Sequence, residues 1–161
     1  MGFGMSAGLA AGLTFPEPEI WTLSGDGGTT MTIQDLVAQH EQGLGIINVV
    51  FTNKSLGFIE AEQDDTKQPH SGIELSDVDF AKVAQGFAIK GYTAHTGAEF
   101  AAILEEVKGT KVPVLIDVKI TNDHLMPVEK LLNAAGAREL LKDYDAAELT
   151  PIKELLAKHQ A

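Results

Sequence analysis

Two apolar runs in the first third of the chain each lead into a residue that can bind a metal ion. The run Ile20–Leu23 is followed by Ser24-Gly25-Asp26-Gly27-Gly28, and the run Ile46–Phe51 is followed by Thr52-Asn53. Together they span the length of one βαβ unit, about 30 or more residues. The spacing therefore predicts two parallel strands with a carboxylate and an amide at their carboxyl ends, where α/β sheets hold their ligands.

If these strands are neighbours, about 4.8 Å apart, the Asp26 carboxylate and the Asn53 amide oxygen can reach the same cation. Two oxygen ligands are few for a hard ion, so a bound Mg2+ would need phosphate oxygens to complete its octahedron, at roughly 2.0 to 2.1 Å per ligand. The adjoining glycines would let the backbone approach such a phosphate. Taken alone, the Ser24–Gly28 segment is more typical of a tight turn, because Asp-Gly and Gly-Gly are common turn pairs.

Apolar runs alternate with helical patterns, which predicts a three-layer α/β fold with a mostly parallel sheet and helices on both faces. Three helix starts are marked by a hydroxyl residue followed three positions later by an acid, a pair that satisfies free backbone donors. The first segment is rich in Gly and Ala and is expected to be a helix packed closely against a sheet or a cofactor. The expected strands are 20–23, 46–51, 92–94 and 112–120. The expected helices are 1–13, 33–42, 78–86 and 98–107, the last three capped by Thr32, Ser76 and Thr96.

The last predicted strand contains one charged residue, Asp117, within the apolar run Val114–Val118. A structural, hydrogen-bonding role is expected for it rather than a catalytic one. Beyond it, residues 127–161 form a charged C-terminal tail in which Thr150 and Pro151 begin a short helix. No linker or repeat interrupts the sequence, so we expect a single domain over residues 1–161.

Charge and composition narrow the classes of partner. The formal net charge of −11 argues against nucleic acid and anionic membranes. The apolar first segment is shorter than the ~20 residues that a membrane span needs, and no Lys or Arg precedes Lys54 to form a signal peptide. The chain has no cysteine, which excludes disulfides and thiol catalysis and is compatible with the cytoplasm. We therefore expect a cytoplasmic protein without a membrane span.

The motif Gly25-Asp26-Gly27 followed by Asn53 resembles the signature of enzymes that use thiamine diphosphate (ThDP). The longer segments 25–36, 48–53 and 57–66 are similar to the pyruvate oxidases of bacteria. The similarity covers nearly the whole chain, but it matches only the C-terminal, diphosphate-binding domain of those enzymes. The resemblance thus implies the ThDP-binding fold and two cofactors, ThDP and Mg2+.

The resemblance also implies roles for individual residues. It makes Asp26, the Asn53 side-chain oxygen and the Ser55 backbone carbonyl the protein ligands of Mg2+. The remaining residues fall into two groups. Those that border the cofactor are Gly25, Gly27, Gly28 and Met1, which matches a hydrophobic residue that bends ThDP; as a free terminus, Met1 should fray. Those at the substrate end of the pocket are Phe58, Ile59 and Glu62. Without the resemblance, a packed Phe58 and a solvated Glu62 on a short helix would explain the same spacing.

The complete enzyme implied by the resemblance decarboxylates pyruvate oxidatively to acetyl phosphate and carries FAD on a middle domain. The glutamate that activates ThDP lies on a separate pyrimidine-binding domain, across a subunit interface. Neither domain is found in these 161 residues, so the chain alone is expected to be inactive and to need a homo-oligomer or a pyrimidine-domain partner. Two alternatives remain open: an acetolactate-synthase-like carboligase or other 2-keto acid decarboxylase domain, and a non-catalytic ThDP-binding fragment.

Overall fold

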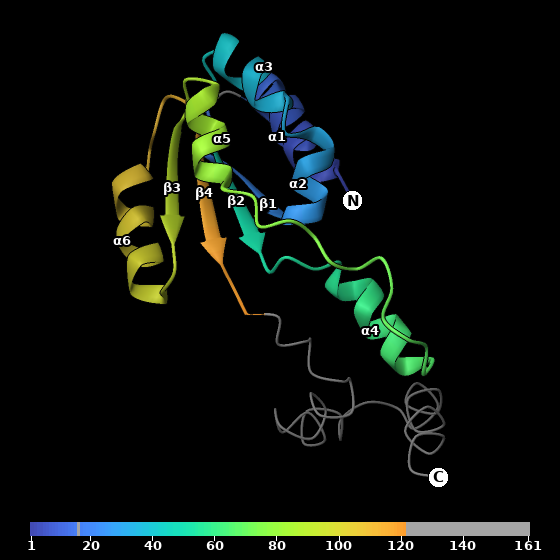
Figure 1. The fold of residues 1–161 in the computed structure, drawn as a ribbon. Helices are drawn as coiled ribbons and strands as arrows, with labels where there is room; N and C mark the ends of the chain where they lie inside the picture. The colour runs from blue at the N-terminus through green and yellow to red at the C-terminus, as the bar shows by residue number, and fades with distance from the viewer. Residues whose placement is uncertain (16, 122–161) are drawn as a thin grey trace, which may run out of the picture. The chain divides into compact units, whose positions relative to one another are not determined.

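In the computed structural model, four parallel strands form one sheet in the order β1-β2-β4-β3 (Figure 1). The strands are β1 (Ile20–Gly25), β2 (Ile46–Thr52), β3 (Lys90–Ala94) and β4 (Val114–Lys119). The structure describes residues 1–15 and 17–121, which belong to one compact unit. The two middle strands, β2 and β4, are buried almost throughout, as their apolar runs predict. The four expected strands and their parallel pairing are confirmed.

Helices cover both faces of this sheet, which confirms the three-layer α/β fold. On one face, Met5, Leu36 and Phe80 from three different helices pack in one core cluster with Val50 and Leu115 of the sheet. On the other face, Val107 and its neighbours on the last helix pack against Ile47, Val49, Ile116 and Val118. The helices are α1 (Phe3–Thr14), α2 (Asp26–Thr32), α3 (Asp35–Glu41), α4 (Gly57–Asp65), α5 (Phe80–Gly86) and α6 (Gly97–Val107).

The small residues of α1 allow it to lie directly on strand β1, as expected from its composition. Gly8 is buried, and a Cβ atom there would collide with the Thr22 methyl group. At Gly4 a Cβ would collide with the Ser24 hydroxyl and lie 3.2 Å from the Leu23 carbonyl oxygen. This close packing holds the start of the chain beside the carboxyl end of β1.

Of the three predicted helix caps, only Thr96 is confirmed. Its hydroxyl accepts the Glu99 amide at 3.2 Å, and the Glu99 carboxylate accepts the His95 amide at 2.7 Å. The prediction for Thr32 was wrong, because its hydroxyl donates to the Gly2 carbonyl and an unexpected helix, α2, ends at this residue. The prediction for Ser76 was also wrong, since α5 begins only after Asp79, whose carboxylate accepts the Lys82 amide.

The contact between β3 and α5 leads to a prediction for Gly91→Ala. The new Cβ would collide with the Ala81 carbonyl oxygen and lie 2.7 Å from the Ala81 Cα, and both are backbone atoms. We expect a loss of about 1 to 3 kcal/mol in the free energy of unfolding, measured by urea titration. Gly97→Ala is the matched control, because nothing lies within 4 Å of its Cβ position at the start of α6. A Gly91→Ala protein as stable as the Gly97→Ala protein would contradict this packing.

Some predictions fall outside the described residues or remain untested. The tail 127–161 and its helix from Thr150 lie in the part of the chain that the structure does not describe. The single domain over residues 1–161 stays a prediction for the same reason. Within residues 1–15 and 17–121, no helix has the length and apolar character to cross a membrane.

Candidate functional site

The register of the sheet brings the two predicted ligand positions to one place. β1 and β2 are neighbours and pair from Ile20 with Ile46 to Gly25 with Phe51. Asp26 follows directly on β1, and Asn53 follows directly on β2, so both lie just beyond the carboxyl edge of the sheet. This confirms that the two strands are adjacent and parallel.

Asp26 joins the two strand ends through its carboxylate. One oxygen accepts the Gly27 amide at 2.9 Å, and the other accepts the Lys54 amide at 2.7 Å. The side chain is buried, although an ionised carboxylate is costly to bury unless hydrogen bonds or a cation compensate its charge. The two amides supply part of that compensation and fix the carboxylate next to the turn that contains Asn53.

The turn after β2 presents oxygen atoms from two further residues. The Asn53 side-chain oxygen accepts the Ser55 amide at 3.1 Å. On the segment that runs antiparallel to this turn, Leu75 donates its amide to the Lys54 carbonyl and the Ile73 carbonyl accepts the Leu56 amide. These two bonds flank Ser55, which is buried and whose hydroxyl donates to Glu60 at 2.7 Å. Asn53 and the Ser55 backbone are therefore held on either side of Lys54.

A cavity of about 410 Å³ opens beside this turn. It is lined by the start of α1, the end of β1, the first turn of α2 and the start of α4, and it includes seven of the predicted site residues, but not Asn53. The lack of a side chain at Gly27 keeps this part of the cavity open. A Cβ atom at Gly27 would lie 2.8 Å from a Leu56 methyl group and 3.1 Å from the Met1 methyl group. The predicted residues in the lining are Met1, Gly25, Asp26, Gly27, Gly28, Ser55 and Phe58.

The residues predicted at the substrate end are only partly brought to this cavity. Phe58 lies in the lining, on α4, and its side chain is 70 % exposed. Ile59 and Glu62 lie on the same helix but are not part of the lining, and both are exposed. The expected short helix is confirmed, while the substrate roles of Phe58, Ile59 and Glu62 stay predictions.

The proposed ligand atoms suit a hard cation that is also coordinated by phosphate oxygens. Among residues 1–15 and 17–121, no three His, Cys, Asp or Glu side chains gather into a metal cluster. Asp26, Asn53 and the Ser55 carbonyl would supply only oxygen atoms, with a single negative charge. Mg2+ typically takes one or two carboxylates and completes its shell with water and phosphate oxygens. The residues present therefore fit Mg2+ bound together with a diphosphate.

Two residues of the site were missed by the sequence analysis. Lys54 takes the left-handed backbone conformation, with φ 62°, in which its amide meets Asp26. Glu60 is buried and receives the Ser55 hydroxyl. A lysine in this conformation has no sequence signal, because the left-handed region favours glycine and asparagine. A glutamate on a short helix is normally expected to be solvated.

Beyond the cavity, the predicted hydrogen-bonding role of Asp117 is confirmed. Its carboxylate accepts the Thr52 hydroxyl, the Phe80 amide and the Lys119 ammonium group, at 2.6, 3.3 and 2.9 Å. Burial lowers the pKa of Lys119, but the hydrogen bonds and charges of Asp117 and Asp77 more than offset this effect and raise that pKa above its ordinary value. Lys119 is thus a stable cation beside the buried carboxylate.

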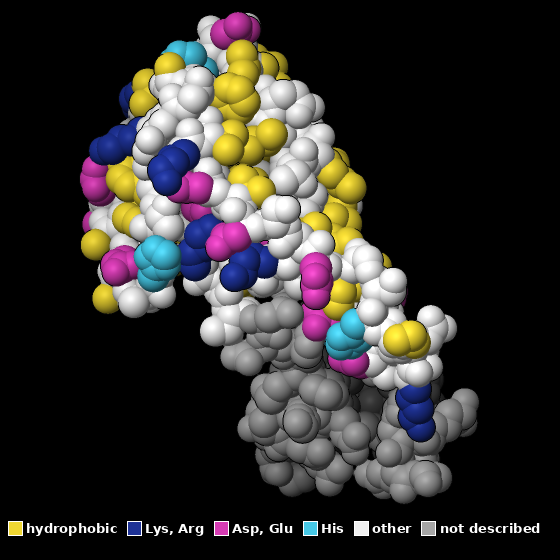
Figure 2. Space-filling view, viewed as in Figure 1, with side chains coloured by type: hydrophobic (Ala, Val, Ile, Leu, Met, Phe, Trp, Pro, Cys, Tyr) yellow, Lys and Arg dark blue, Asp and Glu magenta, His cyan; other side chains and the backbone are white. Residues whose placement is uncertain are grey.

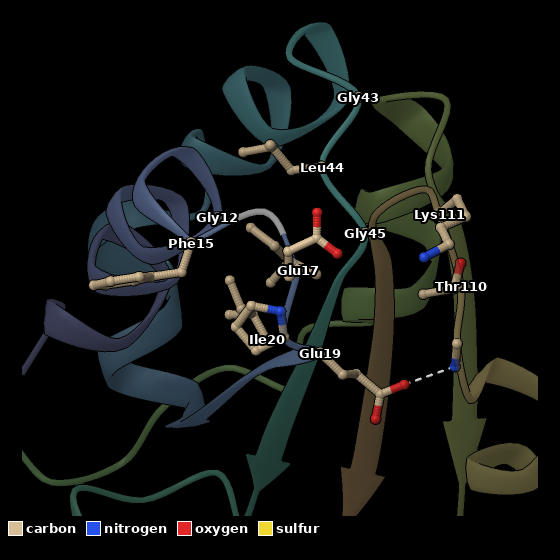
Figure 3. Close-up of a pocket in the computed structure, with 13 residues that line it drawn as sticks. Gly12, Phe15, Glu17, Glu19, Ile20, Gly43, Leu44, Gly45, Thr110 and Lys111 are labelled. Atoms are coloured by element: carbon tan, nitrogen blue, oxygen red, sulfur yellow. Dashed lines mark hydrogen bonds between the residues drawn. The ribbon is translucent and has the colours of Figure 1, made fainter.

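A second cavity, of about 430 Å³, lies at the opposite, amino end of β1 and β2 (Figure 3). It lies between the end of α1, the loop before β2 and the loop before β4, and none of the predicted site residues lines it. At its edge the Glu19 carboxylate accepts the Gly109 amide at 2.6 Å and the Trp21 indole at 2.8 Å. These bonds hold the pKa of Glu19 below its usual value. This cavity does not include the carboxyl ends of the strands or any of the proposed metal ligands.

Comparisons with known proteins point to one family. Residues 1–118 match the family model described as thiamine pyrophosphate enzyme, C-terminal TPP binding domain. The chain is 39 % identical to a pyruvate oxidase of Lactiplantibacillus plantarum over 97 % of its length and 27 % of the relative's. It is 34 % identical to a 3D-(3,5/4)-trihydroxycyclohexane-1,2-dione hydrolase of Clostridium perfringens, over 74 % of this chain and 21 % of the relative. The chain thus spans about a quarter of the length of these curated relatives.

The same fold is found in a solved structure. The chain matches the thiamine diphosphate-dependent 4-hydroxybenzoylformate decarboxylase of Rhodococcus jostii RHA1 with a TM-score of 0.73. The sequences are 22 % identical, and the match covers 78 % of this chain and 24 % of that one. At this level of identity the likeness concerns the fold.

Proposed function

This chain belongs to the thiamine pyrophosphate enzymes through their C-terminal TPP-binding domain, and on this premise we propose that it binds the Mg2+-diphosphate half of ThDP. The observation that carries the proposal is the Asp26 carboxylate, which is bonded to the Lys54 amide across the ends of β1 and β2. Asp26 lines a glycine-rich cavity that Ser55 also lines, and the Asn53 side chain, which is not in the lining, bonds the Ser55 amide on the same turn. The arrangement offers a carboxylate, an amide oxygen and a carbonyl to one cation.

Each part of the site would have a distinct task. Asp26, the Asn53 side chain and the Ser55 carbonyl would hold Mg2+, which in turn neutralises an anionic diphosphate that Asp26 alone would repel. Gly27 and Gly28 lie in the first turn of α2, where backbone amides would bind the diphosphate; in this structure the Gly27 amide donates to Asp26. The absence of side chains at both positions lets the diphosphate approach the backbone.

For the whole protein we propose a pyruvate-oxidase-like reaction, the oxidative decarboxylation of pyruvate to acetyl phosphate with FAD on another domain. When bound, ThDP would supply a nucleophilic thiazolium carbon for a 2-keto acid and a ring that can accept electrons during decarboxylation. Phe58, Ile59 and Glu62 on α4 would bind the keto acid and exclude water. The identity to a pyruvate oxidase, 39 % over 97 % of the chain, exceeds the 34 % to the hydrolase and the 22 % to the decarboxylase and supports this reaction over theirs.

We further propose that a pyrimidine-binding domain, from a partner or a second subunit, covers the mouth of the cavity. Large apolar side chains are exposed around it, among them Met1 at 74 %, Phe3 at 79 % and Phe58 at 70 %. Leu23 and Met31 are also exposed, at 66 % and 58 %. Four of these residues, Met1, Phe3, Leu23 and Phe58, line the cavity, and exposed apolar side chains gathered in this way are typical of a protein interface.

Calorimetry with the 161-residue chain tests the proposed binding. ThDP should bind in the presence of Mg2+ and lose most of its affinity in EDTA, because the metal joins two anionic groups. Thiamine without phosphates is the matched ligand and should bind weakly under both conditions. Equal affinity for ThDP and thiamine, or ThDP binding unaffected by EDTA, would show that the diphosphate half is not held at this site.

A further inference from the structure

Asp117 is a fully buried carboxylate at the end of β4 that lies outside the cavity. Its partners come from three segments: the Thr52 hydroxyl on β2, the Phe80 amide at the start of α5, and the Lys119 ammonium group. Burying an ionised carboxylate is unfavourable unless it is fully bonded. The chain thus keeps a buried carboxylate bonded to Thr52, the residue that precedes the proposed ligand Asn53.

A second set of contacts reaches the same turn from its other side. Lys119 also lies 3.4 Å from the Asp77 carboxylate and donates to the Val78 carbonyl at 3.2 Å. The other oxygen of Asp77 lies 3.9 Å from the Lys54 ammonium group. Figure 2 shows basic and acidic side chains gathered where β2 and β4 end in Figure 1. The contacts therefore run from Thr52 through Asp117, Lys119 and Asp77 back to Lys54.

These contacts enclose the turn that carries the proposed metal ligands. Thr52 is fixed twice, since its hydroxyl donates to Asp117 while its carbonyl accepts the Ile120 amide at 3.0 Å. Lys54 is fixed by its amide to Asp26 and by its carbonyl to the Leu75 amide at 2.9 Å. Asn53 lies between these two fixed residues. The backbone of Asn53 is therefore held from both sides, by Thr52 and by Lys54.

We propose that Asp117 is a positioning residue for the cofactor site, acting through Thr52 to hold the turn 52–55 in the conformation that directs Asn53 and the Ser55 carbonyl toward one cation. The inference rests on the proposed function, because it assigns Asp117 a part in Mg2+-ThDP binding without contact to either. A purely stabilising residue would affect the whole domain, whereas loss of the bond between Asp117 and Thr52 should chiefly loosen the turn 52–55.

The chain offers a matched pair of substitutions that separates the two roles. Thr52→Val removes the hydroxyl that bonds Asp117, and Thr22→Val removes the hydroxyl that donates to Asn48 at 2.8 Å. Both threonines lie on strands of the same sheet and are 2 % and 4 % exposed. Asn48 lies within β2, and its side-chain oxygen also accepts from Gln39 at 3.3 Å. Thr22→Val therefore reports the cost of an equivalent bond away from the turn.

Amide hydrogen exchange of the cofactor-free chain, followed by NMR, is the first measurement. With denaturant chosen so that both variants have the same global stability, the Lys54 and Leu75 amides should exchange about tenfold faster in Thr52→Val than in Thr22→Val. Equal exchange at these amides in the two variants would overturn the inference. This measurement needs no cofactor and remains decisive if ThDP does not bind.

Calorimetry with ThDP and saturating Mg2+ is the second measurement. Thr52→Val should raise the dissociation constant about tenfold, and Thr22→Val should leave it within about twofold of the wild type. Asp117→Asn should act in the same direction as Thr52→Val, since one amide oxygen cannot replace both carboxylate oxygens. Unchanged affinity in Thr52→Val would overturn the positioning role, whereas failure of the wild type itself to bind ThDP would refute the proposed function.

Discussion

Asp26→Ala should abolish metal-dependent binding of ThDP. The substitution removes the only carboxylate that lines the cavity among the described residues and leaves the Gly27 and Lys54 amides without their acceptor. Losing a charged, hydrogen-bonded group of this kind costs roughly 3 kcal/mol, so the dissociation constant in saturating Mg2+ should rise by at least about 100-fold. Calorimetry of both proteins, each with Mg2+ and with EDTA, measures the change.

Asp35→Ala is the control for a general loss of stability. Asp35 lies at the start of α3, where its carboxylate accepts the Ser6 hydroxyl at 2.5 Å, and it is not part of the cavity lining. This variant should keep the affinity and the metal dependence of the wild type. If Asp26→Ala binds ThDP as tightly as Asp35→Ala and still responds to Mg2+, the assigned metal ligand is wrong.

A protein that consists of residues 1–161 alone should bind ThDP without speeding the exchange of its C2 proton. Among the described residues Asp26 is the only carboxylate in the cavity lining, and both of its oxygens are bonded to amides, so it is not placed to activate the cofactor. General acid–base assistance typically contributes about 10²- to 10⁴-fold. NMR in D2O should therefore give an exchange rate within about twofold of that of free ThDP, and no consumption of pyruvate.

Glu62→Gln is the informative variant for this prediction. Glu62 is exposed on α4, so its substitution should change neither the fold nor the exchange rate in the isolated chain. Addition of a pyrimidine-binding domain should accelerate exchange in both proteins. Fast exchange in the chain alone that disappears in Glu62→Gln would make Glu62 the activating group and the chain an enzyme in its own right.

The sheet and the adjacency of the site could be predicted from the sequence because they depend on local pattern. Continuous apolar runs mark β2 and β4, and the length between β1 and β2 indicates a parallel crossover. Since parallel neighbours end at one edge, the proximity of Asp26 to the turn at Asn53 follows from these strands alone. The packing of helix α1 could also be predicted, because Gly and Ala at its contact positions allow close approach to the sheet.

The helix α2 could not be predicted because its sequence, Asp-Gly-Gly-Thr-Thr-Met-Thr, has low helix propensity. Local bonds stabilise it, since Thr29 and Thr30 donate their hydroxyls to the carbonyls of Gly25 and Gly27. Tertiary bonds have the same effect at its end, where Thr32 reaches Gly2. The hydroxyl that resembles a cap in the sequence is therefore used for a contact between distant segments.

The partners of Asp117 also could not be predicted from the sequence. A charged residue in an apolar run indicates a buried bond, but Thr52, Phe80 and Lys119 lie on three segments whose meeting depends on the completed fold. The same holds for Lys54, whose left-handed backbone is imposed by the bonds at both of its peptide groups. These residues shape the turn, while the predicted ligands only mark its position.

The most direct test of the central claim replaces Mg2+ by Mn2+, which accepts similar oxygen ligands and broadens nearby NMR signals. With ThDP present, the amides of Gly27, Gly28, Lys54 and Ser55 should broaden, because they surround the proposed cation position at the ends of β1 and β2. The amides of Gly43 and Gly109, at the cavity on the opposite edge of the sheet, should remain sharp. Broadening centred on Gly43 and Gly109, or no selective broadening at saturating ThDP, would contradict the account.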